Sequence, residues 1–344
     1  MPDIPIALTG ISGVSIASMD DRRSSHSANH AEKVAEIVAS RSAAARSPVA
    51  ASWVRSFHKY GLEPDAPGRT GRLSQSEVGL HREAIGRLFH VSQAVMDQLH
   101  ASLGLAGCSV ILCDADGIVL DQRLRAGDQQ DFETAGLARG ADWSEKRQGT
   151  NGIGTAIAEG RPVHVLRDQH YHTRNTSMIC LGAPVFGETG KLAAVLDVSS
   201  CRGDLDAAFV ALIAQTVEQA AMRIEAENFC RSFSQARIVQ GTAEGQQGPV
   251  LLAVNGDDLV IGATRSARLH YGLDDAALIS PRPAMDILGD QERRGMGLES
   301  AERRELRRAL ARANGNVSAA ARLLGISRAT LYRRMEKLGL LPES

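Results

Sequence analysis

The five cysteines are the residues best suited to covalent or redox chemistry. They are Cys108, Cys113, Cys180, Cys201 and Cys230, an odd number with no C-x-x-C pair. This pattern argues against a disulfide scaffold and against a zinc site. A catalytic thiol needs an exposed thiolate of low pKa and a resolving partner. Because three of the first four lie in apolar, strand-like runs and Cys201 follows the last run, we expect no enzymatic thiol chemistry.

A group of histidines is the second candidate. His164, His170 and His172 lie in and just after a strand-like segment, and Tyr171 separates the last two. No cysteine or carboxylate stands at a spacing that would complete a metal site, so we expect exposed loop histidines, no metal and no cofactor. Cys180, in the middle of an apolar run, is either a small core residue or a redox sensor.

A glycine-flanked polar turn, Gly149-Thr150-Asn151-Gly152, begins a short helical segment that ends at Gly160. Unpartnered amides at a helix start hold a carbonyl, hydroxyl or carboxylate, and glycine lets a ligand approach the backbone closely. Trp143 would either line a pocket beside this turn or fill the core. The predicted effector-binding residues are Trp143, Gly149, Thr150, Asn151, Gly152, His164 and Cys180.

Charge is divided unevenly along the chain. The whole sequence of 344 residues has a formal net charge of −1. Residues 301–340 hold ten Lys and Arg against three Glu, which is +7, so the remainder carries −8. A basic module on an acidic body is typical of a chain that places one part on nucleic-acid phosphates. Double-stranded DNA is therefore the expected partner, and a solvated basic helix face is the alternative.

Three helices are expected to position these basic residues. The first spans residues 299–313. Asn316 is suited to cap a second helix that stops before Gly325, and Ser327 is suited to cap a third that stops at Gly339. Two helices joined by a three-residue turn with glycine make a helix-turn-helix.

The third helix separates its faces. Leu331, Met335 and Leu338 stand at i, i+4 and i+7, so we expect them to pack inward. The opposite face would present donors to base edges and phosphates in the major groove. The predicted DNA-binding residues are Asn316, Ser327, Arg328, Ala329, Thr330, Tyr332, Arg333, Arg334 and Lys337.

A strand-forming block lies upstream of these helices. Five apolar runs occupy residues 109–113, 118–122, 161–166, 178–186 and 191–199. Helical patterns occur before these runs at residues 76–103, between the second and third run at residues 151–159, and after the last run at residues 205–224. This order predicts an α+β domain around one antiparallel sheet.

The remaining segments set the expected domain limits. No run of eighteen apolar residues occurs and no basic segment precedes Arg22, so we expect a cytoplasmic chain without a membrane span or signal peptide. The expected parts are a disordered N-terminus at 1–28, a helical segment at 29–75, a sensory domain at 76–232, a linker with a hairpin at 233–298 and a DNA-binding domain at 299–344.

The C-terminal motif NGNVSAAARLLGISRATLYRRMEKLGL (314–340) closely resembles the Fis-type helix-turn-helix. That resemblance implies a homodimer that binds the major groove, with contacts drawn from the last helix. The hairpin at 250–264 resembles the opening of a PAS domain, which we expect to be truncated.

Three stretches are similar to the GAF-domain regulators of the acetoin-catabolism activator family. They are SWVRSFHKYGLEP (52–64), WSEKRQGTNGIGTAIAEGRPV (143–163) and MICLGAPVFGETGKLAAVLDVSS (178–200). The similarity implies a GAF-type antiparallel sheet with flanking helices that senses a small-molecule effector, such as an acetoin-like ketone or alcohol.

Members of that family usually carry a sigma-54-dependent ATPase module. The sequence contains no G-x-x-x-x-G-K-[ST], and residues 233–298 are too few for a nucleotide-hydrolysing domain. We therefore expect a sequence-specific transcriptional regulator that senses a metabolite and acts without ATP hydrolysis. The alternatives are an architectural Fis-like protein with a ligand-independent dimerising domain, and a thiol-dependent GAF enzyme.

Overall fold

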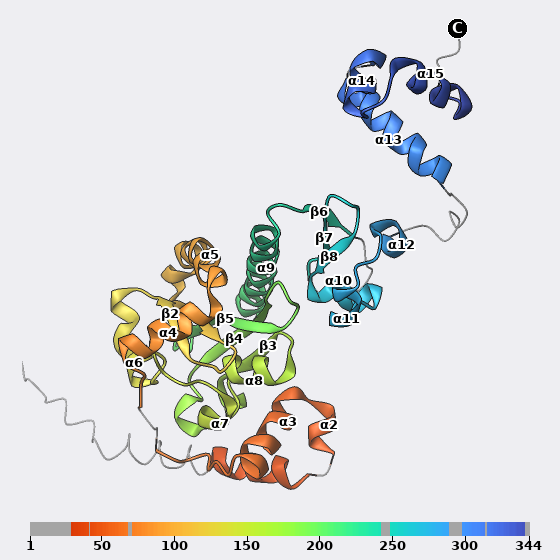
Figure 1. Ribbon diagram of the computed structural model, residues 1–344. Helices are drawn as coiled ribbons and strands as arrows, with labels where there is room; N and C mark the ends of the chain where they lie inside the picture. The colour runs from red at the N-terminus through yellow and green to blue at the C-terminus, as the bar shows by residue number, and fades with distance from the viewer. Residues whose placement is uncertain are drawn as a thin grey trace, which may run out of the picture. The chain divides into compact units, whose positions relative to one another are not determined.

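The computed structural model describes residues 29–40, 42–67, 71–241, 248–288, 298–313 and 315–340. The chain divides into two compact units, Met1–Pro283 and Ala284–Ser344 (Figure 1). The disorder expected for residues 1–28 lies outside the described residues. None of the described helices is long and apolar enough to cross a membrane.

A five-stranded sheet forms the centre of the first unit. Its order is β2-β1-β5-β4-β3, and every neighbouring pair is antiparallel. The strands are β1 (Cys108–Asp114), β2 (Val119–Arg123), β3 (Val163–Leu166), β4 (Ile179–Phe186) and β5 (Leu192–Ser200). The five predicted strands and their antiparallel α+β arrangement are thus confirmed.

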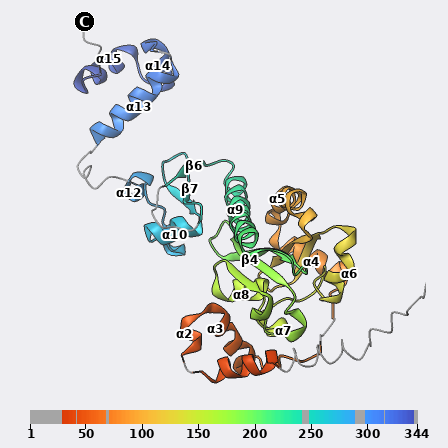
Figure 2. The ribbon, with the colours of Figure 1, turned by 180° about the vertical axis from the view of Figure 1, so that it is seen from behind.

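Helices cover both faces of this sheet. On one face α5 (Arg87–Leu103) and α9 (Ala207–Ser232) lie side by side, as Figures 1 and 2 show, and share one apolar core with the strands. On the other face lie α6 (Gln129–Thr134) and α8 (Gly152–Glu159), whose Phe132 and Ile153 join a second core. Successive side chains of a strand point to opposite faces, so each core takes alternate residues of β1.

Further helices precede the sheet. The helical pattern predicted from residue 76 to 103 is interrupted at Gly86, whose φ of +52° ends α4 (Gln75–Ile85) before α5 begins. Residues 29–39 are helical. The other short helices of this unit are α2 (Ala43–Arg46), α3 (Pro48–Val54), the π-helical η1 (Arg55–Lys59), α7 (Glu145–Gln148) and the 3-10 turns η2 (Gly104–Ala106), η3 (Ala126–Asp128), η4 (Arg167–Gln169) and η5 (Thr173–Asn175).

A second, three-stranded sheet follows α9. It comprises β6 (Arg237–Gln240), β7 (Leu251–Val254) and β8 (Val260–Ala263), and the helices α10 (Arg265–Tyr271) and α11 (Asp275–Ile279) come after it. The predicted hairpin is confirmed by β7 and β8. The stretch interpreted as a linker, however, contains β6, because a four-residue edge strand with two apolar residues gives no readable alternation.

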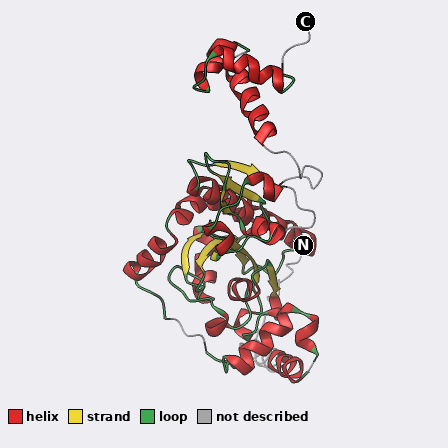
Figure 3. Ribbon diagram, turned by 45° about the vertical axis from the view of Figure 1, so that its right-hand side comes forward, coloured by secondary structure: helices red, strands yellow, loops and turns green. Residues whose placement is uncertain are grey.

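The described residues of the second unit are mostly helical (Figure 3). They are α12 (Ala284–Leu288), α13 (Leu298–Arg312), α14 (Val317–Leu323) and α15 (Arg328–Lys337). The core of the last three contains Leu306, Ala309, Ala320, Ala321, Leu331, Met335 and Leu338. The three helices and the inward-facing residues of α15 are as predicted, whereas α12 falls inside a segment expected to be linker.

Candidate functional site

The two helices of the C-terminal motif begin at the predicted caps. The side chain of Asn316 accepts a hydrogen bond from the amide of Ala319 at 3.1 Å. The hydroxyl of Ser327 accepts one from the amide of Thr330 at 3.1 Å and lies 2.8 Å from the Thr330 hydroxyl. Gly325, between the helices, has a φ of +66°. Local chemistry therefore fixes where α15 starts and how it is presented.

The outward face of α15 is basic and aromatic. Arg328, Ala329, Tyr332, Arg333 and Lys337 are all exposed. The Arg328 guanidinium lies 5.5 Å from the ring centroid of Tyr332, a cation–π distance that orders both side chains. This face has the size and the donors of a helix that reads base edges.

Arg334 of α15 forms an ion pair with another helix of the motif. Its guanidinium lies 2.9 Å from the carboxylate of Glu302 on α13. The side chain predicted to contact DNA therefore also links α15 to α13, the first helix of the motif.

In the first unit, the turn predicted to bind an effector forms hydrogen bonds within itself and with neighbouring residues. The Asn151 side-chain oxygen accepts from the amides of Ile153 and Gly154, both at 2.9 Å. Its side-chain nitrogen donates to the carbonyls of Trp143 and Gly149. The expectation of free amides at this helix start is wrong, because the N-cap asparagine already satisfies them.

The glycines of the turn serve close packing. A Cβ at Gly152 would lie 2.5 Å from Asp197 Oδ1 and 2.7 Å from Cys180 Cβ. A Cβ at Gly149 would lie 2.6 Å from Tyr171 Cβ. Because these glycines lack a Cβ, α8 packs directly on β4 and Tyr171 packs against the turn.

Trp143 and Cys180 belong to the second core. Trp143 is fully buried and donates from Nε1 to the Gly136 carbonyl at 3.1 Å, which confirms the core alternative for this residue. Cys180 Sγ lies 3.2 Å from His170 Nε2 and 3.1 Å from the Ser199 hydroxyl oxygen. The same hydroxyl donates to Asp197 at 2.5 Å, and the other carboxylate oxygen of Asp197 is buried with no partner among the described residues. Burial raises the pKa of Asp197 to about 7.

The histidines are distributed differently from the prediction. His170 and His172 are buried rather than exposed, and burial lowers the pKa of each to about 4, so both are neutral. His164 is exposed and lies 3.3 Å from Glu218 of α9. Its neighbour Val165 packs under α8, so His164 points to the opposite sheet face from Cys180 and does not share a site with it.

The residues that do engage the turn come from the N-terminal helices. The Ser52 hydroxyl donates to Glu145 at 2.5 Å and lies 2.6 Å from the Thr150 hydroxyl. Arg55 donates to Glu145 at 2.9 and 2.8 Å and pairs with Glu159 at 2.8 Å. Sequence reasoning missed this buried network, because its partners are about ninety residues apart.

Four of the five cysteines have thiols whose pKa is raised by burial. Burial raises the pKa of Cys108 and of Cys201 to about 11. It raises the pKa of Cys113 and Cys180 well above the usual range. Each of these sulfurs is therefore a neutral thiol near pH 7.

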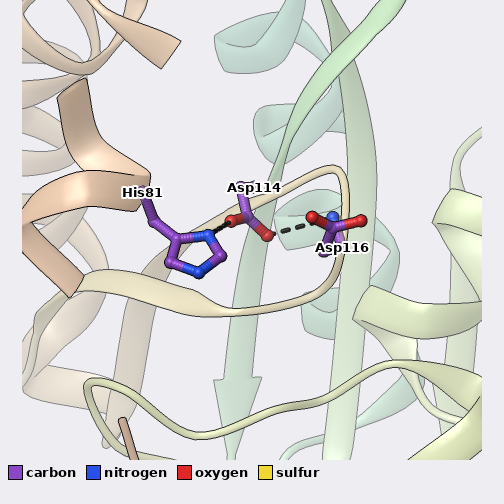
Figure 4. A group of neighbouring side chains, drawn as sticks. All are labelled: His81, Asp114 and Asp116. Atoms are coloured by element: carbon purple, nitrogen blue, oxygen red, sulfur yellow. Dashed lines mark hydrogen bonds and ion pairs between the residues drawn. The ribbon is translucent and has the colours of Figure 1, made fainter. Parts of the chain in front are cut away.

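One group of side chains within the described residues has the composition of a metal site. His81, Asp114 and Asp116 bring three possible ligand atoms within 4.8 Å of one another (Figure 4). One oxygen of Asp114 accepts from the amides of Asp116 and Ile118, and the other lies 2.6 Å from His81 Nδ1. These bonds close the β1–β2 hairpin and hold α4 against it, which accounts for the arrangement without a metal ion.

Comparison with known proteins agrees with this architecture. Residues 88–224 match the GAF domain family, and residues 297–338 match the Fis family of bacterial regulatory proteins. The acetoin catabolism regulatory protein of Cupriavidus necator is 30% identical over 222 residues, which cover 63% of this chain and 33% of that protein. The acetoin dehydrogenase operon transcriptional activator AcoR of Bacillus subtilis is 29% identical over 156 residues, which cover 45% of this chain and 25% of that protein.

The chain thus spans about a third or less of the length of these curated relatives. Among solved structures, the E. coli DhaR(N)–DhaL complex aligns with a TM-score of 0.48 at 14% identity, covering 70% of this chain and 80% of that one. The chain thus carries a GAF domain and a Fis-type helix-turn-helix, and it is similar in sequence to the acetoin catabolism regulators.

Proposed function

We propose that the protein is a sequence-specific transcriptional regulator that binds DNA through α14 and α15 and senses a small molecule through its GAF domain. One observation carries the proposal: Arg328, Tyr332 and Arg333 share the exposed face of a helix whose other face is buried. Such a helix enters the major groove with its outer side chains against base edges.

Charge supports the same assignment. The motif carries the +7 of residues 301–340 on a chain whose total is −1. Neutralised phosphates supply most non-specific affinity and make it depend on salt. Base contacts from Arg333 and its neighbours would supply the sequence preference.

The effect of ligand binding by the GAF domain would be transmitted to the DNA-binding helices through α9. This helix packs on the sheet, and the ring of Phe233, just after its end, lies against Gly262 of β8 in the second sheet. A ligand bound on the sheet would shift α9 between two arrangements only to the extent that it binds one of them more tightly than the other. The resulting coupling to DNA affinity would be about 1–3 kcal/mol.

The proposed mode of action is occupancy of DNA. The sequence offers no phosphate-binding loop, so we propose that regulation proceeds without ATP hydrolysis. Enzymatic thiol chemistry is disfavoured by the raised pKa of Cys108, Cys113, Cys180 and Cys201. An architectural role remains the alternative, and it predicts DNA binding that no ligand changes.

A homodimer completes the proposal. One recognition helix reads only a few base pairs, and two-fold proteins read two half-sites about 34 Å apart. The long helix α9 and the helix α13 are the proposed contacts.

The test is selection of bound sequences from a random duplex pool by the full-length protein. We expect a motif with two related half-sites to be enriched, and its affinity to change when the effector is added. Enrichment of no sequence over background would contradict sequence-specific binding, whereas an enriched motif with no response to metabolites would favour the architectural alternative.

A further inference from the structure

A cavity of about 450 Å³ opens beside the second core of the GAF domain. Its walls come from the segments around residues 71–73, 134–142 and 147–148 and from Arg174. Gly136, whose carbonyl holds the indole of Trp143, also lines it. The volume suits a small metabolite.

The charged groups of this cavity are mostly of one sign. Among the described residues that line it are Arg72, Arg147 and Arg174 and a single carboxylate, Asp142. Arg147 lies 3.5 Å from that carboxylate, so the remaining two arginines leave an excess of positive charge.

Arg174 is held in place by neutral acceptors. It donates to the side-chain oxygen of Gln148 and to the carbonyl of Ala66, both at 2.7 Å. Within the described parts of the chain it forms no ion pair, and loss of solvation lowers its pKa. A guanidinium that is fixed in this way but lacks a counter-charge is preorganised for a bidentate anion.

The floor of the cavity is apolar, since Ile118, Ala135 and Ala141 line it. A second cavity of about 530 Å³, between α9 and α10, holds Arg161 and Arg265 but also Glu218 and Glu225, so its charges balance. The first cavity therefore differs from the second, because it combines an excess of positive charge with an apolar floor.

We propose that this cavity binds a small organic carboxylate, with its carboxylate group at Arg174 and Arg72 and a short hydrocarbon part over Ile118. This inference rests on the proposed sensory function and names the class of its ligand. It differs from the neutral ketone or alcohol that the family resemblance suggests.

The test is calorimetric titration of the full-length protein with butyrate, succinate, the neutral isostere butyramide and inorganic phosphate, at constant ionic strength. We expect at least one carboxylate to bind with millimolar affinity or better and butyramide to bind at least about tenfold more weakly. Arg174→Gln and Arg72→Gln should each weaken carboxylate binding by about tenfold to a hundredfold. Arg231→Gln, which removes an exposed arginine of α9, should leave it unchanged.

Absence of binding by all four probes would overturn the inference, as would equal binding of butyrate and butyramide. Tighter binding of phosphate than of either carboxylate would overturn the carboxylate assignment. Arg174→Lys keeps the positive charge and so tests the contribution of the guanidinium group to recognition. The melting temperature of each variant shows whether a loss of binding is due to misfolding. Because DNA binding is measured on the same samples, a failure here with intact DNA binding rejects the ligand class alone.

Discussion

The guanidinium of Arg55 donates two hydrogen bonds, at 2.9 and 2.8 Å, to the carboxylate of Glu145, which is only 3% exposed. This pair joins the N-terminal helices to the turn before α8. Arg55→Gln would leave the Glu145 charge buried without its partner, and we expect unfolding to become easier by roughly 2–4 kcal/mol. Chemical denaturation of the full chain measures this change.

Lys33→Gln provides the control for that experiment. Lys33, in the helix at residues 29–39, also forms an ion pair, with Asp168 of η4, but both side chains are about half exposed. Its loss should cost less than about 1 kcal/mol. Equal effects of the two substitutions would show that the buried network does not hold this segment.

The raised pKa of Asp197 predicts a pH-dependent stability. Its pKa is about 7 in the folded protein and 3.8 in the unfolded chain, so the folded state binds the proton more tightly. Stability contributed by this group is complete below about pH 4 and is lost as the pH rises through 7. Asp197→Asn should therefore stabilise the protein at pH 8 by roughly 1–4 kcal/mol and change little near pH 4.

Thermal melts between pH 5 and 8 measure this difference. Asp97→Asn, at an aspartate whose side chain is 63% exposed, is the matched control and should show no such trend. A wild-type protein and an Asp197→Asn variant with parallel pH profiles would contradict the assignment of the proton to Asp197.

The cap of the recognition helix gives a third prediction. Ser327→Ala removes the acceptor for the Thr330 amide and should destabilise the second unit by about 0.5–2 kcal/mol. Ser327→Asp keeps an acceptor and should retain most of the stability. Helical circular dichroism during thermal unfolding resolves the two variants, and equal melting of both would contradict a capping role.

Features set by neighbouring residues were predictable from the sequence. Asn316 and Ser327 cap helices because their side chains reach amides three positions away. The five strands followed from apolar runs between turn residues, and the faces of α15 from helical spacing.

Features set by distant residues were not predictable. Gly152 suggested room for a ligand, but its missing Cβ admits Cys180 and Asp197. His170 suggested an exposed loop, but His30 lies 3.1 Å from its carbonyl and the N-terminal helices cover it. The cationic cavity likewise combines Arg72, Arg147 and Arg174, which only the fold brings together.

The proposed dimer is testable in solution. Leu212 of α9 is 58% exposed, which a partner helix would cover. At micromolar concentration, light scattering should give twice the mass of a single chain, which is 36.7 kDa. Leu212→Glu should shift the protein towards the monomer, and a wild-type monomer both free and on DNA would contradict the proposal.

The central claim is that α15 reads DNA sequence, and fluorescence anisotropy titration of the selected site by the full-length protein tests it most directly. Arg333→Ala should cost about 1–3 kcal/mol in binding and relax the preference at one base position in each half-site. Arg161→Ala, at an exposed arginine that precedes β3, should bind as the wild type does. Affinity and sequence preference unchanged by Arg333→Ala together with Arg328→Ala would contradict the assignment of α15 as the recognition helix.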